Sequence, residues 1–416
     1  MNIINEFFVS FILIKLYFKF KVCRKIKFPL LWKFYFSKWK FYFSADILST
    51  ELGMMGIIPI VSQNFSVSIS DAGWSVSIFA LVITFCAPIV PLLCANFNPK
   101  KLMLICLAVF ILSSLIAAFV SEFWQLLVFR AIPAFFHPIY IALALSMAAN
   151  LASDKKDIPK NVGKIFAAVS VGMVLGVPLT SYLGGNFGFE ISMLLFVFLN
   201  LLSFVATLFF VPNFKKENKV KIGKQLLILR YPLLWISILC VVCINAGIWG
   251  FYSYFSDFLL SISKINFDLI SIILALYGFA NIIGNNLAPK LLIKNVNLNL
   301  IFTLLLMIGI YVLIFNFYYQ NMILMILAFI LGILGGVMNN GTHFLISHPF
   351  PRAKDFTNGL FISVANIGLS VGTAICGLVI SLSNTRFIAI SSVVLLSFGI
   401  VIILLRDKIQ SMKLRF

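Results

Sequence analysis

Long apolar runs separated by short, basic gaps are the feature that most limits what this chain can fold into. Each run is close to the ~20 residues that a helix needs to cross a bilayer. Hydrophobic residues make up 62% of the chain and charged residues 11%, whereas soluble domains contain about 45–50% and 25%. A soluble globule of this size could not bury that much apolar surface. The sequence therefore excludes a soluble enzyme, a disordered regulator and a secreted disulfide scaffold. The continuous runs also exclude a transmembrane β-barrel, whose strands alternate apolar and polar residues.

The predicted fold is an all-α polytopic membrane protein with twelve transmembrane helices in two six-helix bundles. The apolar runs and their polar breaks place the spans at 39–60, 72–93, 102–120, 124–149, 164–184, 190–212, 231–256, 268–288, 299–317, 322–346, 359–382 and 387–405. Span ends read in this way are accurate to about 3 residues.

Lysine and arginine predict the orientation of these spans. With the N-terminus inside, 29 of the 32 basic residues lie at the cytoplasmic side, and only Lys264 and Arg386 lie outside. This is the positive-inside pattern of membrane proteins, so the net charge of +19 does not indicate nucleic acid as a partner. We expect a multi-pass protein of a bacterial inner (plasma) membrane with both termini in the cytoplasm.

The longest basic gap divides the spans into six plus six. That plan is typical of a transporter built from two parallel repeats, with its substrate site between the halves near the midplane. The predicted parts are a basic N-terminal segment (1–38), an N-terminal six-helix bundle (39–212), a cytoplasmic central linker (213–230), a C-terminal six-helix bundle (231–405) and a cytoplasmic tail (406–416). Residues 1–38 fit a basic amphipathic segment on the inner leaflet, an additional span, or an unstructured stretch from an unused upstream start.

Charged residues inside the predicted spans are costly and therefore candidates for function. Away from the span ends they are Asp46 and Glu51 in the first span and Arg130 in the fourth. At 1.5 Å per residue, Glu51 and Arg130 lie at similar depths, about 18 and 21 Å above the inner face, so they could meet. His137 follows Arg130 by seven residues, on nearly the same helix face. The hypothesis is that Glu51 exchanges protons under the control of Arg130, with Asp46 and His137 as further candidates. The alternative is a static Glu51–Arg130 pair that only joins two helices.

The second half is expected to have no buried acid or base in its predicted spans, only neutral polar groups and aromatic residues. The substrate-binding candidates are Asn245, Trp249, Tyr252, Asn281, Asn285, Asn339, His343 and Asn366. An aromatic cavity with a few hydrogen-bonding groups suits sugars or amphipathic organic molecules. Asparagine in a membrane also bonds neighbouring helices, so packing is the alternative role.

Six segments carry motifs. They are Glu51-Leu-Gly-Met-Met-Gly-Ile-Ile-Pro59, Ala87-Pro88-Ile-Val-Pro91, Arg130-Ala-Ile-Pro-Ala-Phe-Phe-His137, Gly172-Met-Val-Leu-Gly176-Val-Pro178, Asn245-Ala-Gly247, and Asn366-Ile-Gly368 with Gly372. Through them residues 45–405 resemble the major facilitator superfamily, in particular the sugar-efflux group of its drug:proton antiporter branch. The segment from Cys94 to Lys101 departs from that pattern, because it lacks the Asp and glycines of the usual second-to-third loop.

The resemblance implies that spans five and eight face each other across the two halves. Small residues recur every four positions along span five, from Ala168 through Gly172 and Gly176 to Gly184, and Gly284 lies in a similar stripe on span eight. Such stripes let helix backbones approach closely, so we predict that both form part of the interface that rocks during transport. Packing within one half is the alternative. Further packing and gating candidates are Pro178, Gly368 and Gly372.

The predicted function is export of a small organic solute, a sugar or an amphipathic drug-like compound, by proton antiport with alternating access. The alternatives are a proton-coupled nutrient importer and a membrane sensor that no longer transports. No catalytic residue, metal site or cofactor is predicted, because the gaps hold no phosphate-binding loop and no metal-spaced His/Cys cluster. The Cys240-x-x-Cys243 pair lies in an apolar run without nearby His or acid, where Cys acts as a small hydrophobe. The expected partners are the substrate, protons and the lipid bilayer, with the protein a monomer.

Overall fold

Helices are the regular elements of this protein, as expected for a backbone that must satisfy its hydrogen bonds inside a membrane. The computed structural model describes residues 45–94, 97–150, 158–211, 226–292, 296–350 and 354–413, and no strand occurs among them. The predicted N-terminal segment 1–38 and residues 213–225 of the predicted linker lie outside the described residues.

The first half starts with a broken helix. It consists of α3 (Ala45–Leu52), a 3-10 turn η2 (Gly53–Ile57) and α4 (Ile58–Phe65). The remaining elements of this half are α5 (Ile69–Ala72), α6 (Trp74–Cys86), α7 (Val90–Leu93), α8 (Pro99–Ala118), α9 (Phe123–Asn150), α10 (Ile158–Phe187) and α11 (Phe189–Phe210). Pro88 and Pro91 follow the end of α6 and accompany the interruption of the second predicted span, since proline disrupts a helix interior.

The second half follows a short 3-10 helix, η5 (Leu226–Arg230). Its elements are α13 (Pro232–Ser253), α14 (Phe255–Asp257), the π-helical turn η6 (Phe258–Ile262), α15 (Phe267–Leu291), α16 (Val296–Asn316), α17 (Asn321–Ser347), α18 (Lys354–Leu382), η8 (Thr385–Phe387) and α19 (Ile388–Lys413). Helix α19 continues to Lys413, so it runs through most of the predicted tail.

Ten stretches of the described chain are long and apolar enough to cross a membrane. They coincide with ten of the twelve predicted spans. The predicted first span falls on the broken segment α3–η2–α4, and the predicted fifth span falls on α10, a helix of 30 residues. The break in the first span is the main difference from the expected continuous helices.

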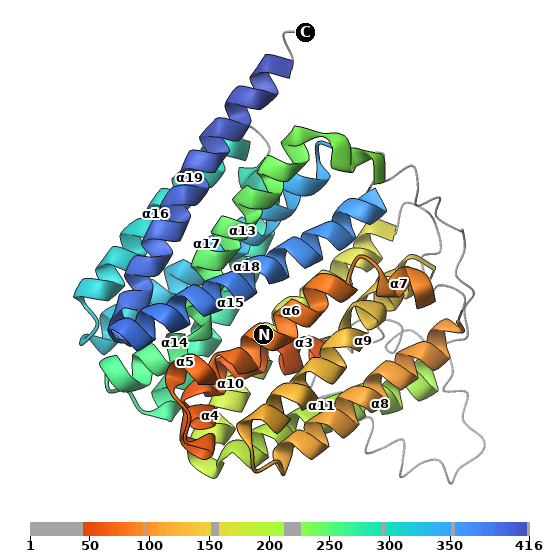
Figure 1. Cartoon of the computed structure of the whole chain (residues 1–416), viewed down its shortest axis with the longest axis vertical. Helices are drawn as coiled ribbons and strands as arrows, with labels where there is room; N and C mark the ends of the chain where they lie inside the picture. The colour runs from red at the N-terminus through yellow and green to blue at the C-terminus, as the bar shows by residue number, and fades with distance from the viewer. Residues whose placement is uncertain are drawn as a thin grey trace, which may run out of the picture. The chain divides into compact units, whose positions relative to one another are not determined.

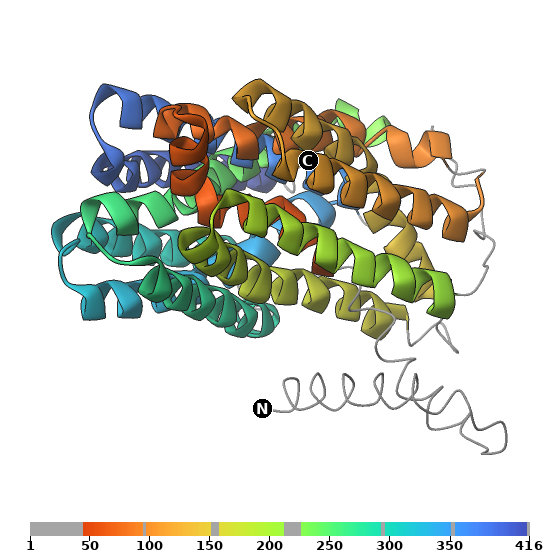
Figure 2. The same ribbon diagram turned by 90° about the horizontal axis from the view of Figure 1, so that it is seen from below.

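Helices of the same half pack mainly with one another, and a few pairs join the halves (Figures 1 and 2). In the first half α8 packs on α9 and α11, and α10 packs on α3. In the second half α13 packs on α18 and α19, and α15 packs on α17. Contacts between the halves come mainly from α10 with α15 and from α6 with α18. Helices α6 and α18 run side by side in Figure 1. Spans five and eight therefore do pack together across the halves, as the resemblance implied.

Candidate functional site

The break in the first span is stabilised by close packing of its glycines. A Cβ on Gly53 would lie 2.7 Å from the ring of Phe196 on α11, and one on Gly56 would lie 2.7 Å from the carbonyl oxygen of Val177 on α10. Because only glycine fits at both positions, the 3-10 turn can lie directly against α10 and α11. Glu51 is the penultimate residue of α3, so the break places its side chain at the end of a helix.

Glu51 and His137 form a buried pair between the first and fourth spans. Glu51 Oε2 lies 3.1 Å from His137 Nε2, and the side chains are only 11% and 5% exposed. The imidazole packs beside the rings of Phe79 and Phe110, with centroids 5.9 and 6.5 Å away. Both ring nitrogens of His137 are buried and make no hydrogen bond in the described part of the chain, so Nε2 meets the carboxylate as a close contact without hydrogen-bond geometry. The pair is thus an ionisable couple in apolar surroundings.

Arg130 lies beside this pair but bonds to main chain. Its guanidinium donates to the carbonyl oxygens of Thr50 at 2.8 Å, Glu51 at 3.3 Å and Ser75 at 3.2 Å. It also lies over the ring of Phe79, 4.4 Å from the centroid. Glu51 and Arg130 therefore meet as predicted, but through the main-chain carbonyl group of Glu51. For the carboxylate, the partner that the structure shows is His137.

Asp46, the remaining proton-coupling candidate, lies on α3, and its side chain is outside the described ones. The next turns of α3 are tied to neighbouring helices. Ser49 donates to the carbonyl oxygen of Gly172 at 3.3 Å, and Asn200 donates to the Thr50 hydroxyl at 2.8 Å. Helix α3, which carries Glu51, is therefore joined to α10 and α11 within one turn of the pair.

The small-residue stripes pack within each half, contrary to the prediction that they form the interface between halves. A Cβ on Gly176 would lie 2.6 Å from that of Ser49, and Gly184 packs on Ser192 and Ile60. Gly284 meets the backbone of α17 at Ile333 and Gly336. Gly368 and Gly372 meet α13 at Asn245 and Ala246. Pro178 lies inside α10 without ending it.

Other residues make the contact between spans five and eight. A Cβ on Gly278 would lie 2.9 Å from the Cα of Val174, and one on Gly185 would overlap the ring of Phe267. Asn186 donates to the Asp268 carboxylate at 3.0 Å. The stripes did not predict which residues form this contact. A small-xxx-small pattern indicates that a helix approaches a neighbour closely, but it does not indicate which neighbour.

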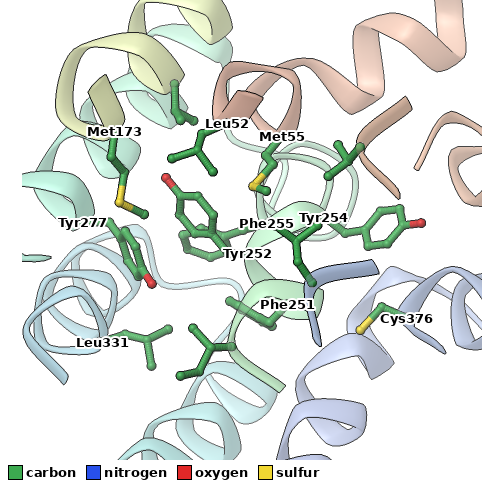
Figure 3. Packing of buried hydrophobic residues seen from close by; sticks show 14 of the residues in the cluster. Leu52, Met55, Met173, Phe251, Tyr252, Tyr254, Phe255, Tyr277, Leu331 and Cys376 are labelled. Carbon is green, nitrogen blue, oxygen red and sulfur yellow. The ribbon is translucent and has the colours of Figure 1, made fainter. Parts of the chain in front are cut away.

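Aromatic candidates of the second half lie between the two halves (Figure 3). The rings of Tyr252 and Tyr277 stack with centroids 4.5 Å apart, and Trp249 meets Tyr252 edge-on at 5.9 Å. The Tyr252 hydroxyl is buried without a hydrogen-bond partner among the described residues. Figure 3 shows it pointing toward Leu52 and Met173 of the first half. Tyr277, which the sequence analysis did not select, is therefore part of this cluster.

The asparagines of the second half mostly bond one another or nearby backbone. Asn285 donates to Asn281 at 2.9 Å, and Asn340 donates to Asn285 at 2.8 Å, which links α15 to α17. Asn340, which the sequence analysis did not select, is therefore part of this chain of bonds, and the neighbouring candidate Asn339 accepts a hydrogen bond from Thr342 at its carbonyl oxygen. The other members have local partners: Asn245 accepts from Trp249, His343 pairs with Asn358, and Asn366 donates to the carbonyl of Ile362.

Two buried charged residues of the second half were missed. Asp257 is 3% exposed and accepts from Thr385 at 2.6 Å and from Ser261 at 3.3 Å. Arg406 is 4% exposed and donates to the Ser237 hydroxyl at 2.9 Å. Both lie one residue beyond the ends predicted for their spans, so they were counted as loop and tail. The helical pattern of the last span continues past Arg406 to Ile409. This sequence signal would have placed Arg406 inside the helix.

Comparisons with known proteins agree with this architecture. Residues 42–318 match the family model of the Major Facilitator Superfamily. The chain is 26% identical over 349 residues to the MFS-type transporter YtbD of Bacillus subtilis, with 82% of this chain and 88% of that protein covered. It is 25% identical to a protein of Helicobacter pylori named probable sugar efflux transporter, with 87% and 91% covered. Among solved structures, a bacterial homologue of the human lysosomal transporter Spinster superposes with a TM-score of 0.71 at 15% identity, covering 89% of this chain and 96% of that chain.

Proposed function

Because the chain belongs to the major facilitator superfamily, we propose that it is a secondary transporter that exports a small organic solute in exchange for protons. The observation that carries the proton coupling is the Glu51–His137 pair, with Nε2 and Oε2 3.1 Å apart and both side chains largely buried. An ionisable carboxylate buried inside a membrane protein is costly and marks proton relays.

The surroundings of the pair favour a titrating role over a static one. A purely structural ion pair needs its remaining polar atoms satisfied, whereas His137 Nδ1 has no hydrogen-bond partner in the described residues. Glu51 also ends α3 next to a 3-10 turn, and such turns inside a helix often mark hinges. Movement of this turn changes the distance from Glu51 to His137 and to water, so the carboxylate takes up a proton in one state and releases it in the other.

The solute would bind at the aromatic cluster between the halves. The stacked Tyr252 and Tyr277 offer flat apolar faces, and the Tyr252 hydroxyl offers a hydrogen bond that it does not make here. Rings of this kind with few polar groups bind sugars and amphipathic organic molecules. The Helicobacter pylori relative named a sugar efflux transporter supports sugars as the first compounds to test.

Alternating access is supported by contacts that close one end of the molecule. Ser256 on α14 donates to the carbonyl oxygen of Met55 at 2.7 Å, and Tyr254 donates to that of Ser70 at 3.5 Å. Lys264, which the charge pattern places outside, lies on the same connection between spans seven and eight. The closed end is therefore assigned to the outer side, so this conformation would open toward the cytoplasm.

Proton flux in everted membrane vesicles tests the proposal. Wild type, Glu51→Gln and the control Glu190→Gln, an exposed acid on α11, would be compared with a pH-gradient dye and a panel of sugars and lipophilic cations. We expect compound-triggered proton release from the wild type and the control, and none from Glu51→Gln. Full release from Glu51→Gln would refute coupling at Glu51. No release from any protein, with insertion verified, would favour the importer or the sensor, and solute uptake into right-side-out cells would distinguish those two.

A further inference from the structure

The break in the first span leaves a backbone carbonyl group open to a donor from outside the helix. In a continuous α-helix the carbonyl of Met55 would accept from the N–H of residue 59. Residue 59 is proline, which has no N–H. The chain forms the 3-10 turn η2 at this point, and α4 begins at Ile58. Met55 is 1% exposed, so any further donor to its carbonyl must come from the protein.

Ser256 of the second half supplies that donor. Its hydroxyl on α14 donates to the Met55 carbonyl oxygen at 2.7 Å, and both residues are buried. The carbonyl groups of Thr50 and Glu51, at the other side of the break, accept instead from Arg130 of the first half. Helix α14 also packs against η2 and α4. The break is therefore held by side chains from both halves, and Met55 is its hydrogen-bonded link to the second half.

Helix α14 is fixed to the second half on its other side. Asp257, which follows Ser256, accepts from Thr385 of η8 at 2.6 Å and from Ser261 of η6 at 3.3 Å. Both donors belong to the second half, so α14 moves with that half. Opening of the outer end separates the halves here, and it must therefore break the hydrogen bond between Ser256 and Met55.

The Met55 carbonyl lies close in sequence to the proton-coupling pair. Glu51 precedes Met55 by four residues, and its carboxylate is 3.1 Å from His137 Nε2. Figure 3 shows Leu52 and Met55 of the first span against the segment of the second half that carries Tyr252. Only a short 3-10 turn separates the two sites, so a shift of the Met55 backbone also moves the end of α3, where Glu51 lies.

We propose that Ser256 is the positioning residue that couples opening of the outer end to protonation of Glu51. In the closed state its hydrogen bond holds the Met55 backbone, and with it the end of α3, where Glu51 meets His137. Opening breaks this bond and lets the turn shift, so the carboxylate meets different surroundings, which changes its proton affinity. By linkage, protonation of Glu51 biases the same opening. The inference rests on the proposed function, in which Glu51 exchanges protons.

Accessibility of the outer end at two pH values tests this role without any solute. A membrane-impermeant maleimide would label Ser70→Cys in right-side-out vesicles at pH 6 and pH 8, with proteins lacking the introduced cysteine as background. Each rate is divided by that of Lys264→Cys, an exposed position, at the same pH, which corrects for the pH dependence of the thiol reaction. Coupling between two sites is commonly about fivefold or more. We expect a change of at least about fivefold between the two pH values with Ser256 present, and of less than about twofold with Ser256→Ala.

Three variants separate coupling from stability. Ser256→Thr keeps the hydroxyl and should keep the pH response. Ser253→Ala removes an equally buried hydroxyl whose hydrogen bonds stay within the second half, and it should also keep the response. Pro59→Ala gives Met55 a donor within its own helix, so it should weaken the response as Ser256→Ala does. The double variant should resemble either single variant, because both substitutions act on the same carbonyl group.

Other ionisable groups near the contact are controlled in the same assay. Glu51 meets His137 and lies beside Arg130, and Asp257 follows Ser256. Glu51→Gln should abolish the pH response and Asp257→Asn should retain it. The opposite result for either variant would assign the response to another group and overturn the inference.

The outcomes distinguish this inference from the proposed function. A wild-type rate that does not change with pH would refute the proton coupling on which both rest. A wild-type response together with a Ser256→Ala rate that shifts equally at both pH values would overturn the inference alone, because a bond that only stabilises the closed state acts at every pH. Labelling of Lys264→Cys verifies insertion of each variant. If Ser256→Ala does not insert, Pro59→Ala tests the same contact from the other half, and an unchanged pH response in it would overturn the inference.

Discussion

At the scale of single residues, Arg130 is a buried cation that donates hydrogen bonds to backbone carbonyl groups. The last carbonyl groups of a helix lack partners within that helix, and Thr50 and Glu51 lie in the last turn of α3. Arg130 donates to both of their carbonyl oxygens, and positive charge is favourable at a helix C-terminus. The arginine therefore stabilises the break in the first span, and it lies where its charge can influence the adjacent Glu51 carboxylate.

Asp257 provides a prediction about pH at the same scale. Burial raises the pKa of this carboxyl above its ordinary value of 3.8, while hydrogen bonds from Thr385 and Ser261 oppose the rise. A raised pKa means that the folded protein holds the proton more tightly than the unfolded chain. This stabilisation is complete below about pH 3.8 and is lost as the pH rises through the raised pKa. We expect the melting temperature of the wild type in detergent to fall more steeply with pH above 4 than that of Asp257→Asn.

The control for this measurement is Glu122→Gln, which removes an exposed acid. It should melt with the same pH dependence as the wild type. Identical slopes for wild type and Asp257→Asn would mean that Asp257 does not titrate differently in the folded and unfolded protein.

At the scale of elements, the sequence predicted which segments form helices but not where they break. Length and apolarity decide that a segment spans a membrane, so ten predicted spans correspond to long helices. The 3-10 turn at Gly53–Ile57 depends on contacts with Phe196 and Val177 from distant parts of the chain, which a local pattern does not contain. The Glu51–His137 pairing was open for the same reason. The predicted depths placed Glu51 and Arg130 at a similar level, so the first and fourth spans were expected to meet. The direction of the side chains determines which residue contacts the Glu51 carboxylate, and in the structure that residue is His137.

The junction of α13 and α14 is the element that closes the outer end in our assignment. Tyr254 is 1% exposed and lies in a slot made by glycines of both halves, where a Cβ on Gly73 or Gly377 would lie 1.9 or 2.8 Å from its hydroxyl. A cavity of about 160 Å³ adjoins this slot. Gly377→Val should destabilise the closed arrangement, since overpacking costs about 1–3 kcal/mol. A cost of about 1.4 kcal/mol, near the lower end of this range, corresponds to about a tenfold shift toward the state open to the outside.

Labelling of Ser70→Cys by a membrane-impermeant maleimide measures this shift, with proteins lacking Ser70→Cys as the background. The rate should rise about tenfold when Gly377→Val is added. Gly309→Val is the matched control, because a Cβ there meets nothing within 4 Å. Equal rates with and without Gly377→Val would show that the slot does not hold this end closed.

At the scale of the whole molecule, the proposal on transport direction depends on one premise, the orientation in the membrane. The contacts of Tyr254 and Ser256 close the end that also carries Lys264, whereas Lys290 and Lys408 lie at the opposite ends of α15 and α19. With these ends assigned by the positive-inside pattern, the structure is closed toward the outer side.

Cysteine labelling in intact cells tests that premise directly. Lys264→Cys and Lys101→Cys replace exposed residues at opposite ends of the molecule. An impermeant maleimide should label Lys264→Cys in intact cells, and Lys101→Cys only after permeabilisation, each compared with the unsubstituted protein as background. The reverse pattern would place the closed end toward the cytoplasm. Proton release in everted vesicles would then have to be reinterpreted as uptake, so this labelling decides how every transport measurement on this protein is interpreted.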